Sequence, residues 1–188
     1  MTVKIRDVKV ILTAPEGINL VVVKVLTSEP ELYGLGCATF AYRHLTVKNL
    51  LENYIKPLVV GQDVSRIEEI WQLMHQNAYW RFGPIENSAI SGIDMALWDI
   101  KGKMANMPVY DLLGGKTREA VKIYRHVDGS SFEEICKNID RFLSQGVTTL
   151  RIQLGGYGGQ YGDAPSSSPK NAPKGVYLDS KRYMKATI

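Results

Sequence analysis

The chain has 188 residues, of which 45% are hydrophobic and 22% are charged, with 23 Lys and Arg against 19 Asp and Glu. This composition is typical of a globular protein and excludes a collagen-like, disordered or disulfide-stapled chain. Apolar runs such as residues 20–23 are far shorter than the roughly 20 residues that a membrane span requires. The formal net charge of +4 is scattered along the sequence, so we expect neither a membrane nor a nucleic-acid partner.

The two cysteines, Cys37 and Cys136, stand apart, without CxxC spacing or clustered histidines. We interpret both as reduced thiols of a cytoplasmic protein rather than as a disulfide. No basic segment followed by an apolar core opens the chain, which agrees with a cytoplasmic location. The length allows one domain or two small ones, and it is too short for a complete (β/α)8 barrel of about 250 residues.

Residues 3–40 are predicted to form three strands of an antiparallel meander. Apolar residues recur at nearly alternate positions over residues 3–12, with a slip between Ile5 and Val8 that indicates a β-bulge. A second strand is predicted over residues 18–26 and a third, which carries Gly34 and Gly36, over residues 33–40. Turn residues separate the three segments.

Helical spacing follows from residue 47 to residue 104. Residues 47–58 carry apolar side chains at i, i+3 and i+4 spacing, and Gly61 ends this helix. Ser65 and Glu68 have the spacing of a capping box, which predicts the start of a second helix. A third helix after Gly83 has one apolar face, made of Ile90, Ile93, Leu97, Ile100 and Met104.

The pattern changes again near residue 120. A strand is predicted over residues 121–126, a helix from the capping box of Ser131 and Glu134 to Gly146, and a strand over residues 148–154. Such a β-α-β unit builds parallel sheets. Residues 155–175 contain six Gly, three Pro and three Ser, which predicts a long loop.

Polar side chains that can carry chemistry lie on the two predicted parallel strands. Alternation puts Leu150 and Ile152 on one face and Arg151 and Gln153 on the other. In a barrel Arg151 points inward, and Gln153 lies near the carboxyl end, where catalytic groups gather. A cation placed there requires an anionic ligand or a salt bridge that merely fills the barrel. His126 ends the preceding strand, where it can bond an anionic substrate or remain a neutral core histidine.

Two tyrosines of the glycine-rich segment, Tyr157 and Tyr161, follow the strand of Arg151. A tyrosine has an unperturbed pKa of about 10 and is a poor base by itself. A neighbouring guanidinium favours the phenolate and lowers the pKa, so a tyrosine beside Arg151 can abstract a proton. The alternative is an exposed loop tyrosine. The glycines match neither GxGxxG nor a Walker loop, so no nucleotide is expected.

Residues 89–103 read AISGIDMALWDIKGK, and the pairs Pro108-Val109 and Leu113-Gly114 follow them. This stretch resembles the first signature of the mandelate racemase/muconate lactonizing branch of the enolase superfamily. Together with RIEEIW at residues 66–71 and AYWR at residues 78–81, it most resembles the mannonate/galactonate dehydratase family members. The resemblance spans essentially the whole chain, but only about the first half of such a protein.

The resemblance implies an α+β capping domain over residues 1–116, followed by residues 117–188 as the first two βα units of a TIM-like (β/α) barrel. The barrel is then incomplete in this chain. The implied activity is an acid-sugar dehydratase for a D-mannonate-, D-gluconate- or D-galactonate-like substrate. In that family Mg²⁺ stabilises the enediolate formed when a base removes the proton alpha to a carboxylate, and loss of the β-hydroxyl gives a 2-keto-3-deoxy acid. The Mg²⁺ ligands are expected beyond residue 188.

The resemblance also implies roles for single residues. Arg151 matches the arginine paired with a loop tyrosine that acts as base, and Tyr161 matches that tyrosine, with Tyr157 as the alternative. His126 matches a substrate-contacting histidine at the end of the first barrel strand, and Gln153 is a further candidate substrate contact.

The capping-domain loop departs from the family pattern. Ala41 stands where the mannonate enzymes have a substrate-contacting asparagine. An alanine cannot make that hydrogen bond, which weighs against D-mannonate. Arg43 is therefore a candidate contact to another sugar acid.

Two interpretations of the chain remain open. In the first, it is the N-terminal portion of an acid-sugar dehydratase that acts as a homo-oligomer at full length. In the second, it is a non-catalytic truncated or degenerate homologue that serves as a binding or structural module. A natural sequence that continues past residue 188 with acidic residues at the ends of three successive strands would favour the first.

Overall fold

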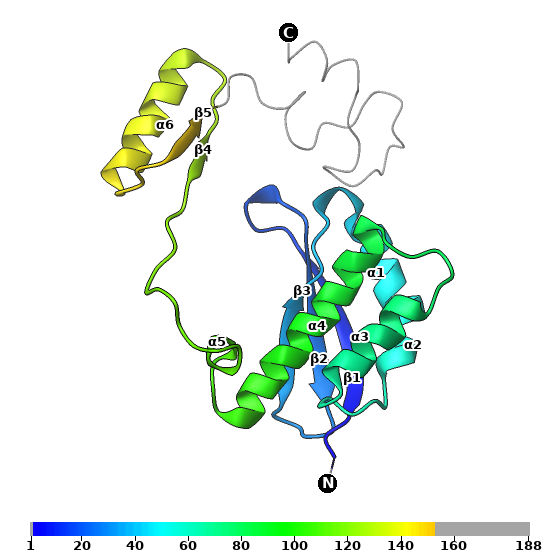
Figure 1. Ribbon diagram of the computed structural model, residues 1–188. Coiled ribbons are helices and arrows are strands. Elements are labelled where there is room, and N and C mark those ends of the chain that lie inside the picture. Colours follow the sequence, from blue (N-terminus) through cyan, green and yellow to red (C-terminus); the bar gives the residue numbers. More distant parts are fainter. Residues whose placement is uncertain (1, 153–188) are drawn as a thin grey trace, which may run out of the picture. The chain divides into compact units, whose positions relative to one another are not determined.

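The computed structural model describes residues 2–152 (Figure 1). The chain divides into two compact units between Lys116 and Thr117, and each unit is described by itself. The assignment of the units as a capping domain and a barrel remains a prediction. No helix among residues 2–152 is long and apolar enough to cross a membrane.

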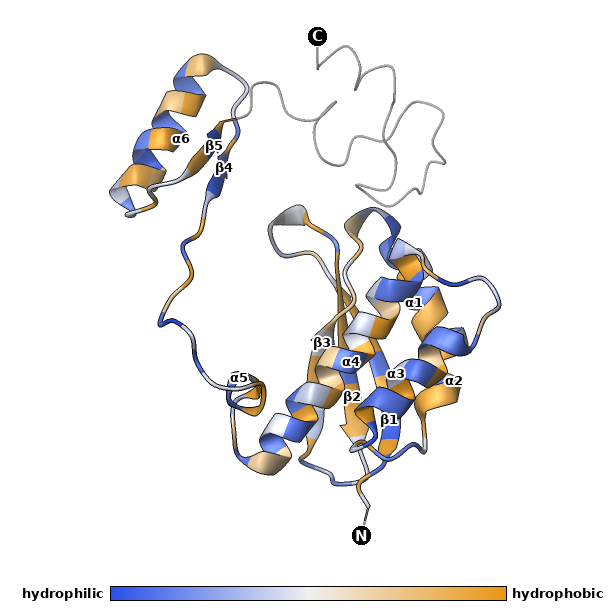
Figure 2. Ribbon diagram, in the orientation of Figure 1, coloured by the Kyte–Doolittle hydropathy of each residue, from blue (hydrophilic) through white to orange (hydrophobic). Residues whose placement is uncertain are grey.

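The first unit begins with an antiparallel sheet of β1 (Ile5–Thr13), β2 (Leu20–Thr27) and β3 (Tyr33–Cys37), in the order β1-β2-β3. The predicted meander is therefore confirmed, and the register shifts between Ile5 and Asp7 where the bulge was predicted. A 3₁₀ turn, η1 (Pro15–Gly17), joins β1 to β2. Figure 2 shows β2 as largely hydrophobic, and its inward side chains Val21, Val23 and Val25 are fully buried.

The next helical segment runs without a break through η2 (Ala41–Arg43), α1 (His44–Leu50), η3 (Leu51–Ile55) and α2 (Lys56–Val59). The predicted helix is confirmed, but its buried face differs from the expected spacing. The buried positions fall every four residues, because η3 is a π-helical turn with more residues per turn than an α-helix. These positions are Val47, Leu51, Ile55 and Val59.

Helix α3 (Ile67–Gln76) begins without the predicted capping box. Arg66 is the N-cap residue and makes no side-chain cap bond. The hydroxyl and the backbone N–H of Ser65 instead both donate to Oδ1 of Asp63, at 2.8 and 2.9 Å. The Ser65 hydroxyl that a capping box would use is therefore hydrogen-bonded to the Asp63 carboxylate instead. The predicted apolar face is otherwise present, with Ile67, Ile70 and Met74 buried.

The long helix α4 (Pro84–Ala105) runs along the sheet and ends at Asn106 in the left-handed conformation. The predicted face is buried except for Met104, which is half exposed in the last turn. The short helix α5 (Val109–Leu112) follows.

Two glycines of β3 allow α4 to approach the strand backbone directly. A Cβ atom on Gly34 would lie 1.9 Å from the carbonyl oxygen of Ala96, and one on Gly36 would lie 1.9 Å from that of Gly92. Any side chain at either position would therefore push the helix away from the sheet. Gly92 is equally restricted, because its Cβ would lie 2.7 Å from that of Ala38.

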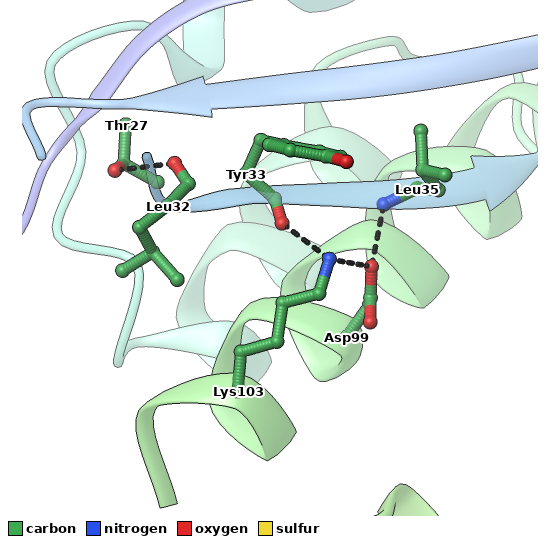
Figure 3. A network of polar contacts seen from close by, with 6 residues as sticks. All are labelled: Thr27, Leu32, Tyr33, Leu35, Asp99 and Lys103. Carbon is green, nitrogen blue, oxygen red and sulfur yellow. Dashed lines mark hydrogen bonds and ion pairs between the residues drawn. The ribbon is translucent and has the colours of Figure 1, made fainter. Parts of the chain in front are cut away.

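Side chains of α4 also bond two backbone groups of β3, which is an edge strand of the sheet. Leu35 N–H donates to Asp99 Oδ2 at 2.8 Å, and Lys103 Nζ donates to Tyr33 O at 2.7 Å and to the same Asp99 oxygen at 2.8 Å (Figure 3). Unpaired backbone groups on an edge strand invite pairing with another chain. Asp99 and Lys103 therefore bond two backbone groups of β3 that a further strand would otherwise pair.

The second unit contains β4 (Arg125–Val127), α6 (Phe132–Ser144) and β5 (Leu150–Ile152), and the two strands pair in parallel. The predicted β-α-β order is confirmed, with three residues in β4 and three residues of β5 within the described part of the chain. Two strands do not define a barrel, so the start of a barrel is not evident in the described residues. The core of this unit is made of Val127, Ile135 and Phe142.

Helix α6 is capped as predicted at its first residues. Ser131 Oγ accepts from Glu134 N–H at 3.2 Å. The Glu134 carboxylate, however, accepts from the N–H and hydroxyl of Ser130 rather than from the Ser131 N–H of a capping box. Gly146 adopts a φ of +82° just after the helix, as its position predicts.

The close approach of α4 to β3 predicts a large penalty for Gly34→Ala. The new methyl group meets a helix carbonyl that cannot rotate away, so we expect the free energy of unfolding to fall by about 2–3 kcal/mol in urea denaturation. Gly83→Ala is the matched control, because there the methyl group meets only the flexible carboxylate of Glu86. Equal losses in the two variants would contradict this account of the packing.

Two carboxyl groups predict opposite effects of pH on stability. Burial, assisted by Glu68, raises the pKa of Asp94 above 3.8, whereas a hydrogen bond from Lys56 holds the pKa of Asp7 below 3.8. At pH 7 the charge on Asp94 therefore lowers the free energy of unfolding. The charge on Asp7 raises it, by less than about 1 kcal/mol because the ion pair with Lys56 is partly exposed.

We expect Asp94→Asn to raise the melting temperature at pH 7 and Asp7→Asn to lower it. The effect of Asp94→Asn should fade as the pH falls through the raised folded pKa towards 3.8. The effect of Asp7→Asn should fade below 3.8, as the pH falls through the lowered folded pKa. Thermal unfolding of both variants at pH 7 and near pH 3 tests this, and shifts of the same sign at pH 7 would refute it.

Candidate functional site

The parallel register of the second unit brings two predicted site residues together. His126 of β4 is the direct partner of Arg151 of β5. Neighbouring strands lie about 4.8 Å apart, and paired residues point to the same face of a sheet. The imidazole and the guanidinium therefore share one face. The opposite face carries Val127, which is fully buried in the core formed with α6.

A third side chain joins this face. The hydroxyl of Tyr124 lies 3.4 Å from Nε2 of His126, and the two rings lie 5.3 Å apart at a tilt of 32°. The spacing of two residues predicts that Tyr124 and His126 lie on one side of an extended strand, although no role was predicted for Tyr124.

Arg43 belongs to the first unit, where it closes the turn η2. Its guanidinium donates from Nη1 to the carbonyl of Tyr42 at 2.7 Å, and its backbone N–H donates to Phe40 O at 2.9 Å. The side chain is exposed at the surface of this unit. The next residue, His44, for which no functional role was predicted, is buried and bonds the same turn.

The remaining predicted site residues, Gln153 and Tyr161, lie outside the described residues, as does the alternative base Tyr157. Their assignments as substrate contact and base stay predictions. Within residues 2–152 no three His, Cys, Asp or Glu side chains gather in a way that could hold a metal ion.

An antiparallel sheet covered by helices, followed by a parallel β-α-β unit, is a mixed α+β architecture with an α/β continuation. Residues 1–114 match the model of the mandelate racemase / muconate lactonizing enzyme, N-terminal domain. The chain belongs to this family of the enolase superfamily. The resemblance inferred from residues 66–114 is thereby confirmed.

Curated relatives extend the match beyond the first unit. A D-galactonate dehydratase family member from Enterocloster bolteae is 52% identical over 188 residues, which cover 99% of this chain and 46% of the relative. Another from Enterococcus gallinarum is 50% identical and covers 98% of this chain and 45% of the relative. The chain thus spans about half the length of the curated relatives it matches.

A solved structure is similar over nearly the whole chain. The crystal structure of an enolase from Pantoea ananatis with bound D-gluconate and Mg is 45% identical, with a TM-score of 0.77. The match covers 98% of this chain and 48% of that protein. The relatives found are therefore enolase-superfamily proteins, among them dehydratase family members and one bound to a sugar acid.

Proposed function

We propose that the chain is the N-terminal portion of an acid-sugar dehydratase, a hydro-lyase that acts in the cytoplasm. The observation that carries the proposal is the parallel register that sets His126 opposite Arg151 on one face of β4 and β5. A guanidinium beside an imidazole suits a substrate with a carboxylate, because both can donate hydrogen bonds to it. The relative that holds D-gluconate supports this substrate class.

In this proposal residues 1–116 are the capping domain and residues 117–188 contain the first two βα units of a TIM-like barrel. The parallel pairing of β4 and β5 around α6 supports the barrel, since such units build parallel sheets. The glycine-rich residues 155–175 then form an active-site loop after the second strand. The complete protein, which we expect to be a homo-oligomer, supplies the remaining strands.

The proposed reaction removes water from the sugar acid without any change in its overall oxidation state. A base takes the proton alpha to the carboxylate, the β-hydroxyl leaves as water, and the resulting enol becomes a 2-keto-3-deoxy acid. Tyr161 is the proposed base, with Tyr157 as the alternative, and Arg151 lowers the pKa of the phenol. His126, Gln153 and Arg43 are the proposed substrate contacts.

Relatives and substrate chemistry both imply Mg²⁺, which the solved relative contains. The described residues hold no suitable cluster of ligands. As the family resemblance implies, we place the carboxylate ligands of the ion beyond residue 188, and the residues of this chain contribute the base and the contacts to the substrate.

The proposal is tested on the complete protein, with residues 1–188 followed by their natural continuation. D-gluconate, D-galactonate and D-mannonate are supplied with Mg²⁺, and the 2-keto-3-deoxy acid is measured. We expect turnover by the complete protein, slowest for D-mannonate, and none by residues 1–188 alone. A complete protein that is inactive across the panel would reject the dehydratase and favour a non-catalytic homologue.

The assignment of the base predicts that Tyr161→Phe lowers kcat by about 10²–10⁴-fold, the usual contribution of a general base. Arg151→Lys should lower kcat less, because it keeps the charge but changes the geometry of the hydrogen-bond donors. Tyr157→Phe is the matched control and should retain activity. If Tyr157→Phe is inactive and Tyr161→Phe is active, the two roles are exchanged, and circular dichroism excludes unfolding as the cause.

A further inference from the structure

The turn that carries Arg43 is held by hydrogen bonds at three successive carbonyl groups. Phe40 O accepts from the N–H of Arg43 at 2.9 Å, and Tyr42 O accepts from its guanidinium at 2.7 Å. The carbonyl between them, Ala41 O, accepts from Nδ1 of His44 at 3.1 Å. Residues 43 and 44 therefore satisfy every carbonyl of the segment 40–42.

The chain that leads into this turn is fixed as well. Ala38 N–H donates to Val21 O at 2.9 Å, and Val21 N–H donates to Oγ1 of Thr39 at 3.1 Å. The thiol of Cys37 donates to the same threonine oxygen at 3.1 Å. The threonine side chain thus takes the place of a backbone acceptor where the chain leaves the sheet after β3. The residues that lead into the turn are therefore held by hydrogen bonds to β2.

His44 differs from its neighbours in the turn because it is buried, with 5% of its surface exposed. A carbonyl oxygen can only accept a hydrogen bond, so Nδ1 of His44 carries the proton of this bond. His44 is also the first residue of α1, whose N-cap residue, Arg43, provides no side-chain cap. The buried ring therefore connects the helix to the turn.

We propose that His44 is a positioning residue that holds the η2 turn so that Arg43 meets the anionic substrate in a preformed orientation. The proposal rests on the substrate contact that the proposed function gives to Arg43. A long side chain that must be ordered during binding loses affinity. A turn fixed beforehand by a buried ring avoids part of that loss, so His44 affects substrate binding rather than the chemical step.

The first test measures the turn itself, in the full 188-residue chain. Trypsin cleaves after Arg43 only when the turn opens, so His44→Leu, which fills the space but cannot donate, should speed cleavage there about fivefold. His44→Asn places an amide N–H near the position of Nδ1 and should restore slow cleavage. Ile70→Val, a core change in α3, controls for general loss of stability.

Cleavage at the wild-type rate in His44→Leu, or equally fast cleavage in His44→Asn and His44→Leu, would overturn the proposal. So would fast cleavage in Ile70→Val. A measurement on the unmodified chain covers the case in which the leucine variant does not fold. The ¹⁵N NMR shifts of His44 should show a protonated Nδ1, and a ring protonated on Nε2 alone would exclude the bond to Ala41.

The second test uses the complete enzyme. His44→Leu should raise KM about fivefold with kcat nearly unchanged, and His44→Asn should recover KM. In an Arg43→Ala background His44→Leu should have no further effect, because its role acts through Arg43. Additive effects would overturn the proposal. If the wild-type enzyme turns over no sugar acid, the proposed function fails, while cleavage and NMR still decide whether His44 holds the turn.

Discussion

The first unit depends on the contact between the backbone of α4 and the backbone of β3. Helices usually pack on sheets through interleaved side chains, but Gly34 and Gly36 contribute none from the strand at this contact. The carbonyl groups of Ala96 and Gly92 occupy the space that two side chains would fill. With the helix at this distance, Asp99 can reach the exposed edge of β3, which a helix further away could not do.

This contact also determines where the chain goes after the sheet. β3 is held on one side by β2 and on the other by α4, so its end at Cys37 has little freedom. Thr39 then bonds back to β2, and His44 bonds back to the turn. Arg43 is thus presented by a segment fixed at both ends. The packing of Gly34 and Gly36 against α4 therefore helps to position Arg43, the proposed substrate contact.

Sequence patterns predicted those features that depend on periodicity. Alternation predicted the three strands, the slip near Ile5 and the position of Arg151 on the face opposite Ile152. Competition between neighbouring groups for one hydrogen bond was harder to predict. The Asp63 carboxylate accepts from the Ser65 hydroxyl, which a capping box would use. The exact pairing of two parallel strands was not predictable either, because it depends on how α6 packs against them. That pairing is what places His126 beside Arg151.

The two faces of the second unit have unequal surroundings. The face toward α6 has a small core around Val127, whereas His126 and Arg151 on the opposite face are exposed. A two-stranded sheet is marginally stable by itself, and Ile152 remains 57% exposed. Further parallel strands would extend the sheet on either side of β4 and β5. Closed into the proposed barrel, the sheet would shield the face with the histidine and the arginine from solvent. The strands that would stabilise the unit would thus also place the guanidinium in the lumen, where the carboxylate of the proposed substrate can accept hydrogen bonds from it.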